Sequence, residues 1–258
     1  MELTSPAEFA KSKVLAVQEY ALLSARSLAN LFRHPRYMAD LIQQADFIGV
    51  GSLPIALLTG FFTGLVLALN FSPSLRRFGA LSQTGQLVAL VMVRELGPVL
   101  TSLMVAGRNA SGMASELGSM QVTEQVDAMR ALGTDPTKKL VTPRVFATVI
   151  MLFFLTIISD LLGLIGGYIY SVAVLGLSTY QYWNNAYQSL TYNDVATGLI
   201  KPLFFGFIIA SVGCYYGLST RGGTQGVGRS TTQSVVTSSV LILATDAVLA
   251  QLLLYWRG

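Results

Sequence analysis

Long apolar stretches separated by short polar segments dominate the pattern of hydrophobic and polar positions. A helix that crosses a bilayer needs roughly 20 largely apolar residues, and five stretches meet that requirement. They lie at about residues 48–71, 85–107, 145–175, 197–218 and 234–256. None of them alternates with the period of two that is typical of a membrane barrel strand. The pattern therefore predicts an all-α integral membrane protein with five transmembrane helices.

The segment before the first span repeats its apolar residues with a helical period over about residues 8–33. One stripe of this predicted helix contains Val14, Val17, Ala21, Ala25, Leu28 and Phe32. Such a helix either packs on the rest of the protein or lies in the cytoplasmic membrane interface, and both can hold. We expect His34-Pro35 to end it. Residues 1–45 then form an amphipathic interfacial region, and 46–258 form the transmembrane bundle of a single domain.

Two connections between the spans carry further signals. Residues 70–84, with Pro73, predict an extracytoplasmic turn or a partly re-entrant piece. Between the second and third spans, Thr123 is placed to N-cap a helix whose early acidic residues favour the positive end of the helix dipole. Gly133 is placed just past its end, and Pro136 follows as a stop. A short helix over 124–132 is therefore predicted, either as a surface connector or as a docking element for a cytoplasmic partner.

Composition and charge support the membrane assignment. Hydrophobic residues make up 52% of the chain and charged residues 12%, with a net charge of +4. Lysine and arginine gather before the first span, between the second and third, and between the fourth and fifth. The positive-inside rule therefore places the N-terminus in the cytoplasm and the C-terminus outside. The basic residues set this orientation and do not predict a nucleic-acid partner.

Most catalytic and metal chemistry is excluded by the residues available. The chain has one cysteine, Cys214, and one histidine, His34, so no intrachain disulfide and no triad or metal-ligand cluster is predicted. Residues 223–230 nearly match the phosphate-binding loop, but Arg229 replaces its lysine and membrane spans flank it. We interpret this segment as a flexible cytoplasmic loop. No cofactor is expected in this chain, and any ATP must be hydrolysed by a partner.

Five charged residues lie within the predicted spans: Arg94, Glu95, Asp160, Lys201 and Asp246. At the bilayer centre each such charge costs roughly 2.5–3.5 kcal/mol on translocon-based scales. Neighbours in a helix point about 100° apart, so Arg94 and Glu95 should find different partners. Lys201 is expected to pair with Asp160 or Asp246. The set can be a structural ion network, the polar lining of a substrate cavity, or a proton relay.

Two features of the second span concern its backbone. Pro98 leaves the carbonyl of Arg94 without its helical donor and favours a kink beside the charged pair. Further along, small residues recur every four positions, which predicts close helix packing within the chain or across a dimer. The two repeats are Ala106/Ala110/Ala114 and Gly107/Ser111/Ser115.

Several segments together resemble the MlaE family, the permease subunits of the ABC transporter that maintains outer-membrane lipid asymmetry. They are residues 94–100 (RELGPVL), 106–108 (AGR), 115–120 (SELGSM), 122–129 (VTEQVDAM), 131–136 (ALGTDP), 143–144 (PR) and 228–232 (GRSTT). The similarity covers nearly the whole chain, so residues 1–258 are expected to form one MlaE-type permease domain.

The resemblance implies partners and a substrate. It implies a homodimer bound to cytoplasmic ABC ATPase subunits, which hold ATP and Mg, to a small STAS-domain subunit, and to a periplasmic hexamer of MCE domains. It implies glycerophospholipid as the substrate and the inner membrane of a Gram-negative bacterium as the location. Two rivals stay open at this point: a secondary transporter that uses the buried charges as a proton relay, and a non-transporting membrane scaffold.

The resemblance also implies roles for particular residues. The helix over 124–132 corresponds to the element that seats in the ATPase, with Glu124, Gln125, Asp127, Ala128 and Arg130 as coupling residues. The lipid site corresponds to Leu67, Ser74, Leu75 and Phe78, with Arg94 and Glu95 nearby. These assignments are expectations carried over from the family.

Overall fold

The computed structural model describes residues 6–30 and 37–255. Every regular element within these residues is helical. In chain order the elements are α1 (Pro6–Asn30), α2 (Met38–Arg77), the 3-10 turn η1 (Leu81–Gln83), α3 (Thr84–Val91), the π-helical segment η2 (Met92–Leu96), α4 (Gly97–Val122), α5 (Gln125–Ala131), the π-helical segment η3 (Thr137–Val141), α6 (Thr142–Ala173), α7 (Thr179–Ser189), α8 (Tyr192–Leu218) and α9 (Gly223–Tyr255).

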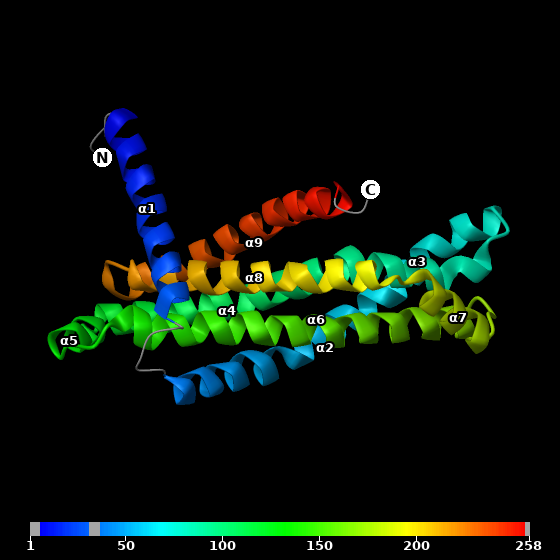
Figure 1. The fold of residues 1–258 in the computed structure, drawn as a ribbon, viewed down its shortest axis with the longest axis horizontal. Helices are drawn as coiled ribbons and strands as arrows, with labels where there is room; N and C mark the ends of the chain where they lie inside the picture. Colours follow the sequence, from blue (N-terminus) through cyan, green and yellow to red (C-terminus); the bar gives the residue numbers. More distant parts are fainter. Residues whose placement is uncertain (1–5, 31–36, 256–258) are drawn as a thin grey trace.

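Five helical segments in the described part of the chain are long and apolar enough to cross a membrane. They are α2, the rod from η1 to α4, the rod from η3 to α6, α8 and α9. Figure 1 shows them running along one direction, with α5 and the α8–α9 connection at one end and α7 at the other. The predicted all-α membrane bundle with five spans is confirmed.

The helices extend beyond the apolar stretches that predicted them. The first span was predicted at 48–71, whereas α2 contains 40 residues and passes through Pro54 and Pro73. The turn expected from Asn70 onward is therefore wrong for its first part, because the chain stays helical to Arg77. A helix keeps its backbone hydrogen bonds outside the apolar layer as well, so hydropathy does not mark where it ends.

Glycines allow α2 and α6 to pack with their backbones almost in contact. A Cβ atom at Gly64 would lie 1.8 Å from the carbonyl oxygen of Gly163, and one at Gly60 would lie 2.2 Å from that of Ser159. Close approach through small residues is a recurrent means of helix association in membranes. This contact holds the first and third spans in a fixed register.

The two small-residue repeats of α4 face different surroundings. Ala106, Ala110 and Ala114 are fully buried, and a Cβ at Gly213 of α8 would lie 3.0 Å from the carbonyl oxygen of Ala110. This repeat therefore packs within the chain, as one of the two predictions stated. Gly107 of the second repeat is exposed, and a Cβ there would have no neighbour within 4 Å.

Helix α1 leaves the bundle at an angle (Figure 1). It contacts the bundle through Tyr20, whose hydroxyl lies 2.9 Å from that of Ser211 on α8, and through the buried Ser27. The predicted apolar stripe points elsewhere, since Val14 is 66% exposed and Val17 is 67% exposed. The prediction that α1 packs on the rest of the protein is therefore confirmed, but the contact uses another face than the apolar stripe. An exposed apolar stripe supports the interfacial alternative, which stays a prediction. Phe32 and the expected stop at His34-Pro35 lie outside the described residues.

Helix α5 forms where the short connecting helix was predicted, but it begins differently. Thr123 does not cap it: its hydroxyl donates to the carbonyl of Ser119, 2.9 Å away, in the preceding helix. The chain instead reverses at Glu124, which has a left-handed φ of 59°. The predicted end is confirmed, because Gly133 has a φ of 76° and its N–H donates to Arg130.

The segment that resembles a phosphate-binding loop is not a loop. Residues 223–230 form the first two turns of α9, so the predicted flexible connection is wrong. No strand precedes the segment within residues 37–255, and a strand is what the nucleotide-binding motif requires.

Candidate functional site

A π-helical turn carries the charged pair of the second span. Within η2 the N–H of Gly97 donates to the carbonyl of Met92, five residues earlier. Pro98 has no N–H to donate to Arg94, so an α-helical turn cannot be completed at this point. The wider turn absorbs the missing bond, as π-bulges do, frequently at functional sites. The loss of the regular helical bond predicted from Pro98 is confirmed, and the kink stays a prediction.

Arg94 pairs with a carboxylate that the sequence reasoning missed. Its Nε and Nη2 atoms each lie 2.6 Å from Oδ1 of Asp194, a fully buried side chain. The other oxygen, Oδ2, accepts from the N–H of Thr191 at 2.9 Å and from its hydroxyl at 2.7 Å. Asp194 thus caps the start of α8 and holds Arg94 as well. A capping pattern, Thr191-x-x-Asp194, was the signal available in the sequence.

Lys201 joins three elements. Its side chain is fully buried and pairs with Glu95 of η2 and with Asp246 of α9, the latter at 2.9 Å. The predicted pair of Lys201 with Asp246 is confirmed, and so is the prediction that Arg94 and Glu95 take different partners. One cation between two carboxylates links the second, fourth and fifth spans through their charges.

Asp160 stands apart from this network, so the alternative pair of Lys201 with Asp160 is wrong. The carboxyl group lies on α6, buried against α4: a Cβ at Gly97 would come 1.6 Å from its Oδ1 atom. That oxygen has no hydrogen-bond partner among the described residues. The pairing was misjudged because the rotation of α6 about its axis cannot be read from which residues are charged.

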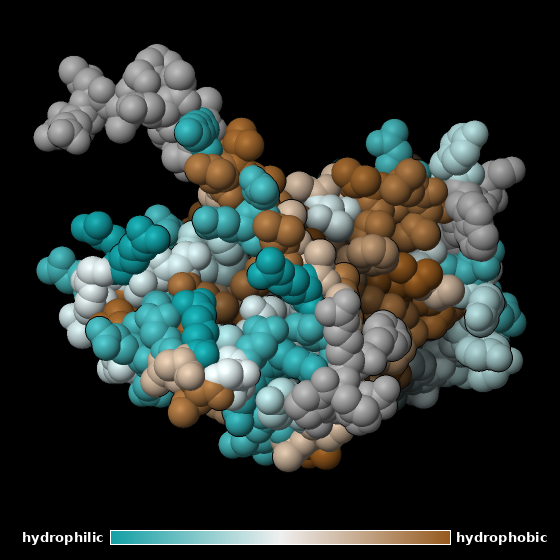
Figure 2. All heavy atoms as spheres, turned by 60° about the vertical axis from the view of Figure 1, so that its left-hand side comes forward, coloured by the Kyte–Doolittle hydropathy of each residue, from teal (hydrophilic) through white to brown (hydrophobic). Residues whose placement is uncertain are grey.

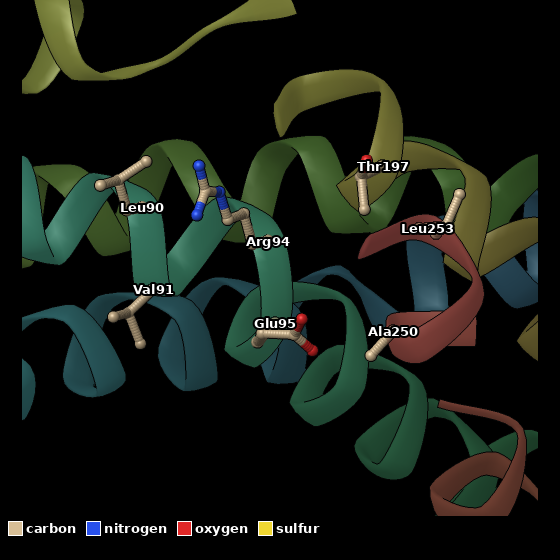
Figure 3. Close-up of a pocket in the computed structure, with 7 residues that line it drawn as sticks. All are labelled: Leu90, Val91, Arg94, Glu95, Thr197, Ala250 and Leu253. Atoms are coloured by element: carbon tan, nitrogen blue, oxygen red, sulfur yellow. The ribbon is translucent and has the colours of Figure 1, made fainter. Parts of the chain in front are cut away.

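A cavity of about 250 Å³ opens beside the network, lined by Leu90, Val91, Arg94, Glu95, Thr197, Ala250 and Leu253. Figure 3 shows the side chains of Arg94 and Glu95 leaving their helix in different directions. These side chains are 36% and 45% exposed. Arg94 keeps Nη1 and Glu95 keeps Oε1 without a hydrogen bond in the described part of the chain. Besides the hydroxyl of Thr197, the cavity therefore offers the free Nη1 group of Arg94 as a donor and Oε1 of Glu95 as an acceptor, on walls that are otherwise apolar.

The other residues assigned to lipid lie elsewhere in the chain. Leu75 is buried, Leu67 packs on an interior cluster, and Ser74 and Phe78 are exposed near the end of α2. None of the four lines the cavity beside Arg94. One chain by itself does not bring the two groups together, and their lipid contacts stay a prediction.

The residues assigned to coupling share one exposed surface. Val126 is fully buried in a cluster with Leu117 and Val145, which anchors α5 to the bundle. The predicted coupling residues are all exposed: Glu124, Gln125, Asp127, Ala128 and Arg130. Figure 2 brings this end of the molecule forward and shows hydrophilic residues gathered there, with apolar residues on the flank. Leu132, which follows the last residue of α5, is 83% exposed.

Comparison with known proteins assigns the chain to a family. The model of the family described as Permease MlaE matches residues 41–252, which include most of α2, every element from η1 to α8, and most of α9. The chain belongs to the MlaE permease family. The resemblance carried by segments between residues 94 and 144 and by residues 228–232 is thereby confirmed, and the match covers the transmembrane bundle up to residue 252.

Individual MlaE relatives are similar over most of their length. A probable ABC transporter permease protein of Rickettsia felis is 43% identical over 92% of both chains. The intermembrane phospholipid transport system permease protein MlaE of Haemophilus influenzae is 35% identical, over 83% of this chain and 82% of its own. The chloroplastic protein TRIGALACTOSYLDIACYLGLYCEROL 1 of Arabidopsis thaliana is 37% identical, over 92% of this chain and 68% of its own. As a member of this family, the chain is a permease subunit and not an enzyme.

Proposed function

We propose that this chain is the membrane subunit of an ABC transporter that moves glycerophospholipids between the inner membrane of a Gram-negative bacterium and the periplasmic route to its outer membrane. By this movement it maintains outer-membrane lipid asymmetry. The Haemophilus relative is named for intermembrane phospholipid transport. The observation that carries the proposal is the cavity beside η2, in which apolar walls surround a cation and a carboxylate.

The chemistry of the cavity suits a lipid headgroup within the membrane. A phosphate can take the free Nη1 donor of Arg94, since hydrogen bonds between ionised groups are about twice as strong as neutral ones. The acyl chains then lie along Leu90, Val91 and Leu253. Asp194 fixes the arginine in place, so the donor is positioned before the lipid arrives.

We infer that two copies of the chain form the complete site. A cavity of about 250 Å³ is smaller than the roughly 300–1,000 Å³ of ordinary small-molecule pockets, and a two-chain lipid is larger than such molecules. The repeat Gly107/Ser111/Ser115, in which Gly107 is exposed and both serines are partly buried, offers small residues for close approach by a second copy. The lipid would lie between the protomers, where α2 of the partner can supply the predicted contacts of Leu67, Ser74, Leu75 and Phe78.

Cysteine crosslinking tests the homodimer. With Ser111→Cys we expect oxidation to join two protomers, at least fivefold more than with Leu161→Cys, a matched control on α6 that is 54% exposed. The native Cys214 is buried and should not react. The fraction of crosslinked dimer is measured by non-reducing electrophoresis. Equal fractions for the two variants would show that α4 does not form the dimer interface.

ATP is hydrolysed, in this proposal, by a cytoplasmic ABC ATPase that binds ATP and Mg and contacts the exposed residues of α5. A STAS-domain subunit accompanies the ATPase, and a hexamer of MCE domains receives or delivers lipid on the periplasmic side. The N-terminus is cytoplasmic and the C-terminus periplasmic. The position of α5 supports this arrangement, because Val126 couples it to the core beneath α4 and α6.

Charge reversal on α5 tests the coupling. We expect Glu124→Lys combined with Gln125→Lys to reduce ATP-dependent lipid transport at least tenfold while the bundle stays folded, because both side chains are exposed. Lys substitutions at the exposed Thr224 and Gln225 of α9, at the same end of the molecule, serve as the control. ATPase co-purification and transport by proteoliposomes are measured together. Normal assembly with normal transport would rule out α5 as the coupling element.

One observation favours a different transporter. The buried, unpaired Asp160 is a residue that a proton relay could use, in an ATPase-independent secondary transporter. That protein would move lipid alone in liposomes under a proton gradient. We expect no lipid movement from the isolated chain under a proton gradient. The same liposome assay compares this result with ATP-dependent transport by the whole complex.

A further inference from the structure

A second arginine of the α4 rod is held as firmly as Arg94. Arg108 lies 14 positions after Arg94 and therefore about 21 Å further along the helix, toward α5. Its guanidinium group crosses to α2, where a Cβ at Gly51 would lie 2.2 Å from Nη2 and 2.8 Å from Cζ. Only a residue without a side chain leaves room for the guanidinium against the backbone of α2.

The hydrogen bonds that Arg108 makes in the described part of the chain all come from one nitrogen of its guanidinium group, Nη1. Nη1 lies 3.0 Å from Oδ1 of Asn109, 3.1 Å from the hydroxyl of Ser52 and 3.3 Å from the carbonyl oxygen of Phe47. Asn109 and Ser52 are buried. Within the described residues, Nη2 and Nε donate no hydrogen bond. A fixed guanidinium with free donors has the geometry that binds phosphate through two parallel bonds.

A cavity between α2 and α4 lies next to Arg108, since two of the residues that line it, Phe47 and Asn109, accept hydrogen bonds from the guanidinium group. This cavity measures about 350 Å³ and is lined by Gln43, Gln44, Phe47, Ile48, Asn109, Gly112, Met113 and Glu116. Phe47 connects the cavity to Arg108, because it lines the cavity and its ring centroid lies 4.9 Å from Cζ of the arginine. The walls combine apolar side chains with amides, as a site for the neck and upper chains of a lipid would.

The one carboxylate in the cavity wall does not cancel the arginine. Glu116 pairs with the buried Arg144 of α6 at 2.8 Å. It also lies eight residues beyond Arg108, about 12 Å along α4. With Glu116 neutralised by Arg144, the positive charge of Arg108 is available to an anion.

We propose that Arg108 and this cavity form a second phospholipid site, which binds the headgroup phosphate of a lipid in the cytoplasmic leaflet. The inference rests on the proposed lipid transport and adds a second binding site to the route of the lipid. Arg94 and Arg108, on one continuous rod, would each bind the phosphate at a different depth of the membrane. An arginine that only set the topology would extend its charge into water, whereas Arg108 is held by three acceptors and a glycine.

Site-specific photocrosslinking tests the site in the assembled transporter. A photoreactive residue at Gln44, in the cavity wall, is expected to capture phospholipid from native membranes. Arg108→Gln should lower this capture at least fivefold. Gly51→Ala should do the same, because the three atoms nearest to the added methyl group all belong to the guanidinium, which it displaces. Arg221→Gln, which removes an exposed charge at the same end of the molecule, should leave the capture unchanged.

Three outcomes would overturn the second site. Capture at Gln44 that is unchanged by both Arg108→Gln and Gly51→Ala would remove the arginine from it. Equal capture of diacylglycerol in vesicles of phosphatidylglycerol and diacylglycerol would show that phosphate is not recognised. Loss of lipid capture in millimolar inorganic phosphate would identify the free anion as the ligand.

A photoreactive residue at Leu253, beside Arg94, separates this inference from the proposed function. Lipid captured at Leu253 but not at Gln44 would refute the second site alone. Lipid captured at neither position would count against the proposed lipid function itself.

Discussion

Lys201→Met is expected to lower the free energy of unfolding by about 3 kcal/mol, because it leaves Glu95 and Asp246 facing each other without their cation. Removal of one partner from a buried pair costs about 3–5 kcal/mol. The lower end applies here, since the Glu95 side chain is 45% exposed. Lys11→Met, at an exposed lysine of α1, should change stability by less than about 0.5 kcal/mol. Unfolding of both variants in detergent, followed by intrinsic fluorescence, measures the difference.

A triple variant separates charge from packing. Lys201→Met with Glu95→Gln and Asp246→Asn removes all three charges, and neutral replacements of a buried ion network are often tolerated. We therefore expect stability to return to near that of the unaltered protein while lipid transport stays impaired. If the triple variant were as unstable as Lys201→Met, the loss would come from packing of the lysine stem and not from unpaired carboxylates.

Arg94→Gln is expected to reduce lipid transport roughly ten- to hundredfold, since a hydrogen bond to a charged group contributes about 1.5–3 kcal/mol. The protein should still fold, because Asp194 keeps its two bonds to Thr191, although its stability should fall since this buried carboxylate loses its cation. ATP-dependent transfer of labelled phospholipid by proteoliposomes that contain the whole complex measures the effect. Arg26→Gln, an exposed arginine on α1, is the control.

The opposite result for Arg94→Gln has a definite meaning. Normal transport, together with a lowered unfolding temperature, would assign Arg94 to bracing the start of α8 against η2. Arg94→Lys adds a second comparison, because lysine keeps the charge but cannot bind Asp194 and a phosphate through one planar fork. We expect the Arg94→Lys variant to transport lipid faster than Arg94→Gln and more slowly than the unaltered protein.

Hydropathy was sufficient to predict the five spans but not their ends. Apolar runs report which part of a helix faces lipid, whereas α2 continues to Arg77 and α9 begins at Gly223, both outside their apolar stretches. The end of α5 could be predicted because a single residue determines it: Gly133 adopts the positive φ that ends the helix. The prediction of its start failed at Thr123, because that hydroxyl bonds back into α4 and Glu124 makes the reversal.

The charged residues of the site were identifiable from the sequence, but their partners were only partly so. Within a span every charge demands compensation, which singled out Arg94, Glu95 and Lys201. Which carboxylate faces which cation depends on the rotation of each helix, so Asp160 was a wrong candidate for Lys201. Asp194 was missed because it lies three residues before the predicted start of the fourth span, where a charged residue is not unusual.

The four lipid residues predicted on and after α2 illustrate a different limit. Leu67, Ser74, Leu75 and Phe78 share no cavity with Arg94 in one chain. A site at the centre of a dimer depends on residues of two copies, and a single sequence does not specify how the copies meet. The π-helical turn at η2 was likewise not specified by the sequence. Pro98 indicates that the helix is irregular there, but not which form the irregular turn takes.

Photocrosslinking from Leu253 in the assembled transporter tests the central claim most directly. We predict that phospholipid is captured there, that Arg94→Gln lowers the capture at least fivefold, and that ATP hydrolysis by the partner ATPase changes the amount captured. A complex that transports phospholipid while none is captured at Leu253, with or without ATP, would contradict the account.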